Sequence, residues 1–582
     1  MRQRIECTEV PGSPRREHGG GTEAVGGLLR RRAAVGLCAM AVLLAGCSLP
    51  TPHMPLRTNA QGGRDFYVSP QGDDSADGRT PQTAWRTLRR ADALRFEPAD
   101  RLRLQGGARF AGTLSIGQGD AGDARKPVVI ESYGNGRATI AAAGTRGIEV
   151  HNTSGVTIRN LIVVGDGASY RDEDGIAFVS DLPGHRKLPY IRVSGVEVTG
   201  FQNGIRLHGG PKASGFRDVE IYDCALHTNQ DAGLVTDGPA FDPDAPAYAH
   251  EDVTVSKVSA YQNVGDPAAS GRNTGSGIVL GSVSHGTVQQ SVARDNGAYS
   301  SATAMEGPEG IWTYDSTRMT FQRNISYGNH SGSQVDGGGF GLDNNVSHSL
   351  MQYNLAHGND GAGFLAYSAV WNSVHTDNTI RYNVSHNNGR KIQDYGGIVA
   401  EGSRVTHLSI YQNTVLNTAN GSVRAPALRL QPNLGSVTVR NNVFVTDGAP
   451  VVAAQGNFDT SDVLMQGNDY HSSGGWILQW GDHWYSDLAS WRQAAGQEVQ
   501  GPRATGTNAD PCLAQVALPA SGPNLYGIGP TRGALTSQCV RTLAGAAVDL
   551  RTLGVNPGSV DYFGARLRGS PVAGAVQAVP KA

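Results

Sequence analysis

The sequence predicts an all-β fold in which short strands stack into the successive coils of a solenoid. Three observations predict it: a glycine content about twice the usual share, short strands with period-two alternation, and a unit that recurs at a nearly constant step. The regular step argues against independent domains, and the short strands exclude a βαβ sheet.

The composition is that of a turn-rich, weakly charged chain. Of the 582 residues, 78 are Gly, 39% are apolar and 17% are charged. The 49 Lys and Arg residues nearly balance the 51 Asp and Glu residues, so no overall field draws the protein to nucleic acid or to an acidic membrane surface. No apolar run reaches the roughly 18 residues that span a bilayer. We therefore expect neither a nucleic-acid partner nor a transmembrane segment.

A sequence unit recurs from about residue 147 onward. It consists of Gly-apolar-x-apolar, a loop, an alternating strand and then Asn-x-x-x-x-Asn. One copy runs from Gly310-Ile311-Trp312-Thr313 to Asn324 and Asn329, and the next begins at Gly339-Phe340-Gly341-Leu342. The first Asn recurs at 324, 354, 383, 413, 442 and 468, in steps of 30, 29, 30, 29 and 26 residues. A step this regular is hard to reconcile with independent domains.

The unit has no room for a helix. Its strands are only four to six residues long, and no long segment of 3.6-residue period separates them, which excludes a βαβ sheet. Such short strands must pair with their copies in neighbouring units, so we expect about eleven coils of a parallel β-solenoid. The Asn residues, stacked at a fixed turn, can hydrogen-bond to one another along the axis.

The chain resembles the right-handed parallel β-helix proteins of the pectate-lyase superfamily, over residues 64–475. The segment Phe66 to Asp74, followed by Trp85 and Leu88, looks like the N-terminal cap of secreted members. The aromatic-rich segment Trp476 to Trp491 resembles the cap that covers the last coil, so residues 476–582 are expected to form a small C-terminal capping segment and tail. The resemblance implies the fold strongly and the reaction weakly, because this scaffold hosts lyases, hydrolases, epimerases and adhesins.

The N-terminus predicts export. Arg30-Arg31-Arg32 precedes an apolar stretch that ends in Leu44-Ala45-Gly46-Cys47, which resembles the bacterial lipobox. We expect residues 1–46 to be a signal peptide, Cys47 to be lipidated and residues 47–63 to be a tether, although an ordinary cleaved signal remains the alternative. The protein would then be an exported bacterial lipoprotein of the outer membrane, cell surface or periplasm, held to the membrane only by its lipid. In an exported chain, Cys512 and Cys539 could form a disulfide.

Alternation along the strands predicts which side chains leave the core. If the residue after the Gly points inward, the second and fourth residues after it point outward. The fourth position reads His151, Val179, His208, Asp237, Gly281, Tyr314, Asp343, Tyr367, Glu401 and Gln431, and the second includes Arg206 and Trp312. Asp343 and Glu401 lie two coils apart, about 10 Å, near the separation of an inverting acid/base pair. Trp312, Tyr314 and Tyr367 offer flat surfaces to sugar rings.

A second set of acidic residues stands three positions before the Gly. It comprises Asp336, Asp360 and Asp394, each close to a Gly. Neighbouring carboxylates would repel, so a shared proton, a cation such as Ca²⁺ or a substrate contact is expected there. Turn capping is the alternative interpretation, because an Asp side chain readily accepts hydrogen bonds from nearby backbone N–H groups.

The sequence leaves three candidate functions open. The first is a glycoside hydrolase that cleaves a polysaccharide by carboxylate acid/base catalysis, with candidates Asp343, Glu401, Asp336 and Asp360. The second is a uronate-specific lyase or C5-epimerase, in which Arg206 neutralises the uronate and His208 removes the C5 proton. The third is a non-catalytic glycan-binding lipoprotein. In each, Arg206, Asp237, Trp312, Tyr314 and Tyr367 are expected to bind the glycan, and the protein is expected to be a monomer. The motif set of polygalacturonases is absent from the sequence, which disfavours that activity.

Overall fold

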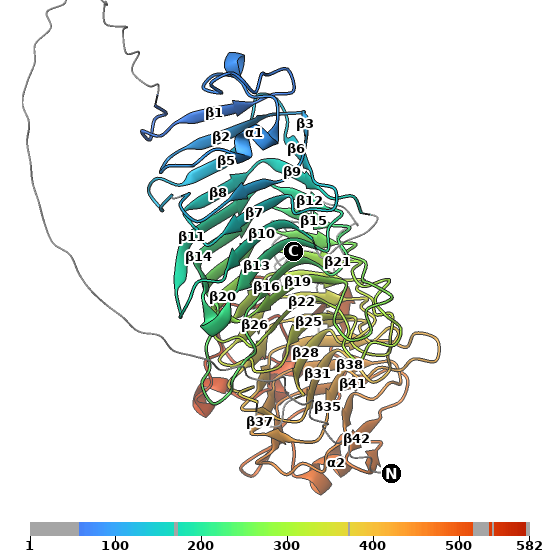
Figure 1. The fold of residues 1–582 in the computed structure, drawn as a ribbon. Helices are drawn as coiled ribbons and strands as arrows, with labels where there is room; N and C mark the ends of the chain where they lie inside the picture. Colours follow the sequence, from blue (N-terminus) through green and yellow to red (C-terminus); the bar gives the residue numbers. More distant parts are fainter. Residues whose placement is uncertain are drawn as a thin grey trace, which may run out of the picture. The chain divides into compact units, whose positions relative to one another are not determined.

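The structure, a computed structural model, describes residues 58–120, 122–167, 173–369, 373–515, 535–537 and 540–577. It is the all-β parallel β-helix that the sequence predicts, with three parallel sheets running along its length (Figure 1). The predicted signal peptide, Cys47 and most of the tether lie outside the described residues. Within the part of the chain that the structure describes, no helix is long and apolar enough to cross a membrane.

The strands and helices have the following bounds. The first sheet contains β1 (Asp65–Val68), β2 (Arg101–Gln105), β5 (Val128–Tyr133), β8 (Val156–Arg159), β11 (Lys187–Ser194), β14 (Gly215–Tyr222), β17 (His250–Ser256), β20 (Val283–Gln289), β23 (Thr320–Gln322), β26 (Leu350–Gln352), β29 (Thr379–Arg381), β33 (Ser409–Tyr411), β37 (Val437–Arg440) and β40 (Val463–Gln466). The second sheet contains β4 (Leu114–Ile116), β7 (Ile148–His151), β10 (Asp174–Ser180), β13 (Asn203–Gly209), β16 (Ala232–Asp237), β19 (Ser276–Gly281), β22 (Glu309–Tyr314), β25 (Gly338–Leu342), β28 (Phe364–Ser368), β31 (Ile398–Gly402), β35 (Leu428–Leu430), β39 (Val452–Ala454), β42 (Leu478–Trp480) and β43 (His483–Tyr485). The third contains β3 (Arg109–Ala111), β6 (Ala138–Ala141), β9 (Leu161–Val164), β12 (Glu197–Thr199), β15 (Ala225–His227), β18 (Ser259–Tyr261), β21 (Val292–Arg294), β24 (Ile325–Tyr327), β27 (Leu355–His357), β30 (Val384–His386), β34 (Thr414–Asn417), β38 (Val443–Thr446) and β41 (Asp469–Ser472).

Smaller elements complete the fold. Short pairs are formed by β32 (Val405–Thr406) with β36 (Leu434–Gly435), β44 (Val499–Gln500) with β45 (Arg503–Ala504), and β46 (Leu513–Gln515) with β47 (Leu535–Ser537). The α-helices are α1 (Leu88–Asp92), α2 (Leu488–Ala495) and α3 (Val540–Ala546), and 3-10 turns occur at Pro81–Thr83, Pro211–Ala213 and Leu550–Leu553.

The number of coils corrects the sequence estimate of eleven. Among the described residues the three sheets have 14, 14 and 13 strands, so the chain makes about thirteen coils. The additional coils lie before residue 147, where β1 to β6 pair without the Gly and Asn repeat that the estimate counted. The helix also continues past residue 475, because β42 still pairs in parallel with β39 before β43 turns back against it.

Two rows of asparagines run along the axis inside the coils. In one, the side-chain amide of Asn324 donates to Asn354 at 3.1 Å, and the pattern continues through Asn383, Asn413, Asn442 and Asn468. In the other, Asn229 donates to Asn263, and the row continues through Asn296, Asn329, Asn359 and Asn388. These side chains are buried, so each amide must find its partner within the stack. The rows hold the coils between Asn229 and Asn468 in register with one another.

The repeated Gly is explained by its position against these rows. A Cβ at Gly310 would lie 1.9 Å from Ser326 Oγ and 2.7 Å from Asn329 Nδ2, inside the core. The residue after each Gly also points inward, as Ile311 does, so strict alternation is interrupted at the Gly. As a result, the side chain of the residue before the Gly points to the outer face of the sheet.

Both ends of the coil stack are covered. At the N-terminal end the ring of Phe66 stacks on Trp85 with centroids 5.2 Å apart. At the other end Trp491 of α2 is buried against Tyr470 and Trp480. These contacts are the caps that the sequence indicates.

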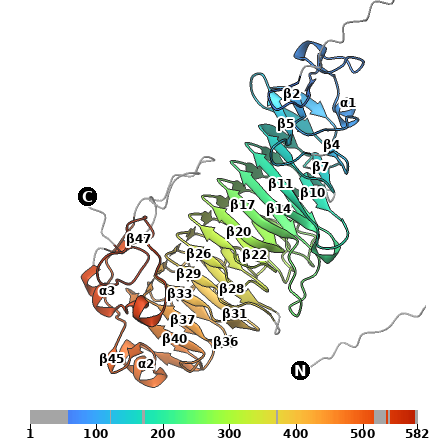
Figure 2. The same ribbon diagram turned by 90° about the vertical axis from the view of Figure 1, so that its left-hand side faces the viewer.

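The C-terminal segment does more than cover the last coil. Residues 548–577 run beside the coils from β26 to β38, as Figure 2 shows, and bond to several of them. Tyr353 donates to the Val560 carbonyl at 3.1 Å, and the Ala575 N–H donates to Thr414 Oγ1 at 2.9 Å. Cys512 is disulfide-bonded, whereas its predicted partner Cys539 lies outside the described residues, so that pairing stays a prediction.

The close packing at the repeated Gly predicts a measurable cost of adding one methyl group. A Cβ at Gly363 would lie 2.4 Å from Ser385 Oγ and 2.5 Å from the Gly397 carbonyl oxygen. We expect Gly363→Ala to lower the free energy of unfolding by about 1–3 kcal/mol, as overpacking does. At Gly271 nothing lies within 4 Å of such a Cβ, so Gly271→Ala is the matched control and should leave the thermal midpoint unchanged. Equal midpoints for both variants would contradict the inward position of the repeated Gly.

Candidate active site

The outward columns predicted from the sequence are present on the second sheet. Strand pairing aligns Val179 with His208 and His208 with Asp237, and farther along it aligns Gly281 with Tyr314 and Tyr367 with Glu401. Trp312 lies opposite Gly341 on the neighbouring strand. The columns thus follow the strands β10, β13, β16, β19, β22, β25, β28 and β31 that cross the centre of Figure 1.

Glu309 is the acidic residue that the sequence reading missed. It stands directly before Gly310, where strict alternation would turn it into the core. Because the Gly position itself faces inward, the side chain of Glu309 faces outward instead. A Cβ at Gly341 would lie 2.0 Å from Glu309 Oε2, so the carboxyl group lies on the outer side of the sheet over Gly341. Only 4% of Glu309 is exposed, and neither carboxyl oxygen has a hydrogen-bond partner among the described residues. An acidic residue directly before the repeated Gly is the sequence signal that could have identified Glu309.

Glu309, Asp336, Asp343 and Glu401 form what we call the carboxylate cluster. Burial raises the pKa of Asp343 to about 8, and the charge of Asp336 adds to the effect. Burial likewise raises the pKa of Glu401 to about 7, although Arg429, whose Nη1 lies 3.6 Å from Glu401 Oε2, opposes it. The pKa of Glu309 is raised well above its usual value by burial and by the other three carboxyl groups. The cluster therefore retains protons at neutral pH.

Asp336 is the member of the cluster best prepared to carry a charge. It lies in the loop before β25, where its Oδ2 accepts from the Gly307 N–H at 2.9 Å and its Oδ1 from the Tyr395 hydroxyl at 3.0 Å. Burial raises its pKa to about 6, while these two hydrogen bonds lower it. Lys391 donates to the carbonyls of Ser331 and Ser333 and so holds the same loop. Tyr395 and Gly307 were not identified from the sequence.

Asp360 and Asp394 do not join Asp336, which corrects the expected row of three. Asp360 Oδ2 contacts His330 Nδ1 at 3.3 Å and accepts from the Ser331 N–H, so its partners belong to the loop at residues 330–331. Asp394 is exposed. Within the described ranges, no group of three or more His, Cys, Asp or Glu side chains is arranged to hold a metal ion. The residues expected to bind Ca²⁺ thus do not assemble a site.

The aromatic residues lie where the columns place them. The rings of Trp312 and Tyr314 are 5.4 Å apart, and the Trp312 Nε1–H donates to Ser276 Oγ at 3.2 Å. The ring of Tyr314 lies over Gly281, where a Cβ would approach it to 2.3 Å. Tyr367 is half-buried beside Tyr395, and burial together with Asp343 raises its pKa to about 12. The rings flank the carboxylate cluster along the axis.

Arg206, His208 and Asp237 form a second group, farther toward the N-terminus on the same sheet. Arg206 Nε donates to Asp237 Oδ2 at 2.8 Å, and His208 Nδ1 contacts Asp237 Oδ1. Although burial opposes it, the hydrogen bonds from His208 and Arg206 hold the pKa of Asp237 below its usual value. With Nδ1 held by Asp237, His208 presents Nε2 as its remaining nitrogen. Asp237 therefore positions the side chains of Arg206 and His208 and is not free to act as an acid.

The geometry provides a proton donor and a charged carboxylate together. At neutral pH Asp343 is protonated, whereas Asp336 is largely ionised, because their surroundings separate their pKa values. The two residues stand at either end of β25, and the charge of Asp336 contributes to the raised pKa of Asp343.

Comparison with known proteins gives the following matches. A family model described as "Right handed beta helix region" matches residues 251–425. A lacto-N-biosidase of Bifidobacterium longum subsp. longum is 22% identical over 519 residues, which cover 71% of this chain and 31% of that protein. The chain thus spans about a third of the length of this curated relative.

Solved structures with a related fold were also found. The native structure of a lacto-N-biosidase from Eubacterium ramulus is 15% identical, with a TM-score of 0.37, over 67% of this chain and 65% of that one. A pectate lyase structure is 14% identical, with a TM-score of 0.42, over 90% of this chain and 97% of that one.

The raised pKa of Asp343 predicts how stability depends on pH. Because this pKa is higher in the folded state, the folded protein binds more protons, and stability falls as the pH rises from about 4 to about 8. Asp343→Asn removes this loss, so its thermal midpoint relative to the parent should increase across that range. Asp394→Asn, which removes an exposed carboxyl group, supplies the control. A midpoint difference that changes with pH no more for Asp343→Asn than for Asp394→Asn would show that Asp343 is not a buried acid.

Proposed function

We propose that the protein is a carbohydrate-active enzyme, a glycoside hydrolase in which Asp343 is the general acid. The observation that carries the proposal is the pair Asp343 and Asp336, whose environments raise one pKa to about 8 and the other only to about 6. Such a separation is how two like residues take opposite roles in proton transfer.

Each carboxyl group then has a defined task. Asp343 donates its proton to the oxygen of the leaving sugar as the glycosidic bond breaks. Ionised Asp336, held by Tyr395 and the Gly307 N–H, acts on the anomeric carbon, either directly or by activating water. Glu401 is ion-paired with Arg429 and is better placed to hold a sugar hydroxyl than to transfer a proton.

The substrate class follows from the surface around the pair. Trp312 and Tyr314 lie on β22 and Tyr367 lies two coils farther on β28, so a glycan chain along the solenoid axis would meet the first two rings together and then Tyr367. The name of the curated relative, a lacto-N-biosidase, supports glycoside hydrolysis and an oligosaccharide or polysaccharide substrate.

The proposal includes the location predicted from the leader. An exported lipoprotein anchored through Cys47 would place the coils where external glycans arrive, and the tether would keep them off the membrane. A monomer suffices for the reaction, because the carboxylate cluster comes from a single chain.

The test is the loss of activity on conservative substitution. Reducing ends released from a panel of neutral and acidic glycans should fall by roughly 10²–10⁴-fold in Asp343→Asn and in Asp336→Asn. Glu401→Gln should lose less activity. If Glu401→Gln matches Asp343→Asn while Asp336→Asn stays active, the working pair is Asp343 and Glu401 instead. Full activity in Asp343→Asn would overturn the proposal.

The pH profile gives an independent prediction. Rates should rise as Asp336 ionises near pH 6 and fall as Asp343 loses its proton near pH 8. The Glu401→Gln variant should keep both limbs of the bell, since Glu401 transfers no proton. A profile that is flat from pH 5 to 9 would contradict the assignment.

The second candidate function is a uronate lyase or C5-epimerase, favoured by the hydrogen-bonded group Arg206, His208 and Asp237. His208 Nε2 would remove the C5 proton and Arg206 would face the carboxylate. In that case ultraviolet-absorbing unsaturated products would form, and His208→Ala would abolish them while Asp343→Asn would not. Binding of glycans without turnover in the parent protein would favour a non-catalytic glycan-binding role.

A further inference from the structure

The first sheet carries a hollow that the carboxylate cluster does not involve. It has a volume of about 450 Å³ and lies over the outer face of β2, β5, β8, β11 and β14, with Gln61 at its rim. Three arginines and one carboxylate line it, together with two tyrosines: Arg101, Arg159, Arg192, Glu220, Tyr190 and Tyr222. We refer to it as the arginine hollow. Its size is that of ordinary ligand sites.

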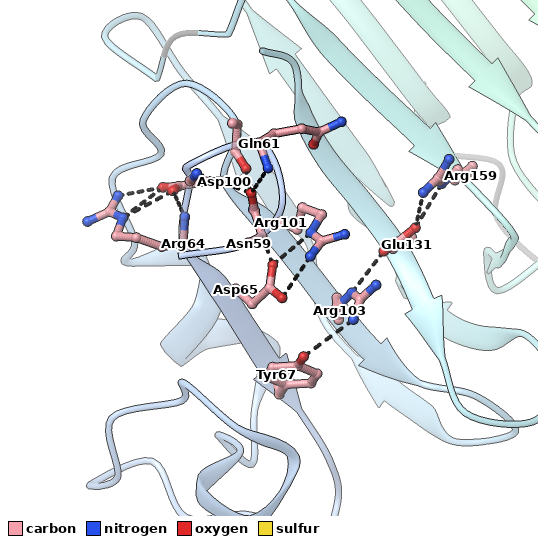
Figure 3. A network of polar contacts seen from close by, with 12 residues as sticks. Asn59, Gln61, Arg64, Asp65, Tyr67, Asp100, Arg101, Arg103, Glu131 and Arg159 are labelled. Carbon is pink, nitrogen blue, oxygen red and sulfur yellow. Dashed lines mark hydrogen bonds and ion pairs between the residues drawn. The ribbon is translucent and has the colours of Figure 1, made fainter. Parts of the chain in front are cut away.

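Ion pairs with residues outside the hollow hold two of the arginines in fixed orientations. Arg101 bonds Asp65 through Nε and Nη2 at 2.7 and 2.9 Å, and Arg159 bonds Glu131 through the same two atoms at 2.8 and 2.5 Å (Figure 3). Asp65 and Glu131 do not themselves line the hollow. One edge of each of these two guanidinium groups is committed, which leaves the edge that carries Nη1 to present planar donors. Arg192 differs, because its Nη1 donates to the Ile191 and Asp218 carbonyls, its Nη2 donates to Asp218 Oδ1 and its Nε faces Glu220.

The tyrosines supply flat surfaces beside these donors. Tyr190 has a left-handed backbone, with φ of 70°, and stands opposite Asp218, whose backbone is left-handed as well, while the strand pairing keeps its register on both sides of them. The Arg192 guanidinium lies 4.3 Å from the Tyr190 ring centroid. Tyr222 is 37% exposed. The rings and the arginines therefore face a common space.

The spacing of the charges indicates an extended ligand. Arg101 and Arg159 are two coils apart and Arg192 is one coil farther, so the cationic groups spread over about 14 Å along the axis. The open guanidinium edges belong to Arg101 and Arg159, two coils or about 10 Å apart along the axis, so a single phosphate or sulfate would meet only one of them. A chain of sugars with carboxylate groups at intervals would meet both, while its ring faces lie on Tyr190 and Tyr222.

We propose that the arginine hollow is a binding site for an acidic oligosaccharide, separate from the carboxylate cluster on the second sheet. The site binds and does not cleave, since it holds one carboxylate, Glu220, which is paired with Arg192 at 3.3 Å. It would hold a polyanionic glycan on one face of the coils. This proposal goes beyond the hydrolase and does not depend on it.

The test is a binding measurement that requires no turnover. The full chain is titrated by calorimetry with hexagalacturonate and, separately, with maltohexaose as the neutral chain of equal length. Hexagalacturonate should bind and maltohexaose should not. Arg159→Gln and Tyr222→Ala should each weaken binding at least tenfold, whereas Arg217→Gln should leave it unchanged, because Arg217 is exposed on β14 outside the hollow.

Three outcomes would overturn the proposal. They are equal binding of the two hexasaccharides, binding that neither Arg159→Gln nor Tyr222→Ala weakens, and binding displaced by inorganic sulfate at the concentration of the sugar. Thermal midpoints equal to the parent show that the variants are folded, and Tyr222→Phe, which keeps the ring, should restore binding. Loss of reducing-end release leaves these readouts unaffected, so failure of the hydrolase and failure of this site are distinguished.

Discussion

The two buried rows of asparagine amides are the constraint on which the rest of the molecule depends. Each amide is out of reach of water, so it is satisfied only if the next coil places its own Asn at the same height. This requirement fixes the register at the turn between the first and third sheets for residues 324–468, and at the turn between the third and second sheets for residues 229–388. The repeated Gly belongs to the same constraint, since a Cβ there would collide with the Asn side chains. Packing of Ile, Val, Leu and Phe fills the space that these corners define.

Because the register is fixed, residues that are far apart in the sequence come together in one site. Asp343 directly follows β25, and Tyr367 and Glu401 lie on β28 and β31, so residues far apart in sequence occupy one position of successive coils. The loops between sheets then add groups that the strands cannot provide. Asp336 enters from a loop whose carbonyls are held by Lys391, and Tyr395 from the following loop fixes its carboxyl group. The scaffold thus supplies spacing, and the loops supply the hydrogen bonds that adjust the acidity of individual carboxyl groups.

The sequence predicts the fold and the columns because both follow from periodicity. The step between Asn residues and the alternation after the Gly are local patterns, and the strand pairings reproduce the predicted alignment of His208, Asp237, Tyr314 and Glu401. Coils without the repeat were missed because β1 to β6 lack the Gly and Asn pattern and are held by apolar packing and by ion pairs such as Arg101 with Asp65. Glu309 was missed because the inward Gly breaks alternation, and Tyr395 because a contact between loops leaves no period in the sequence. Asp360 was assigned to the wrong group for the same reason, since its partner His330 also lies in a loop.

The amide rows also have a direction. In every link the donor belongs to the earlier coil and the acceptor to the later one, so the side-chain dipoles add along the axis and leave a positive end at the last coil. Asn468, the last donor of its row, meets Glu498, whose carboxylate also accepts from Tyr470 and Thr505. The solenoid is therefore electrically polar, and the buried carboxyl group of Glu498 terminates it. Coils could be inserted or removed within the row without disturbing that polarity, but a chain that ended before Glu498 would leave a buried donor without its acceptor.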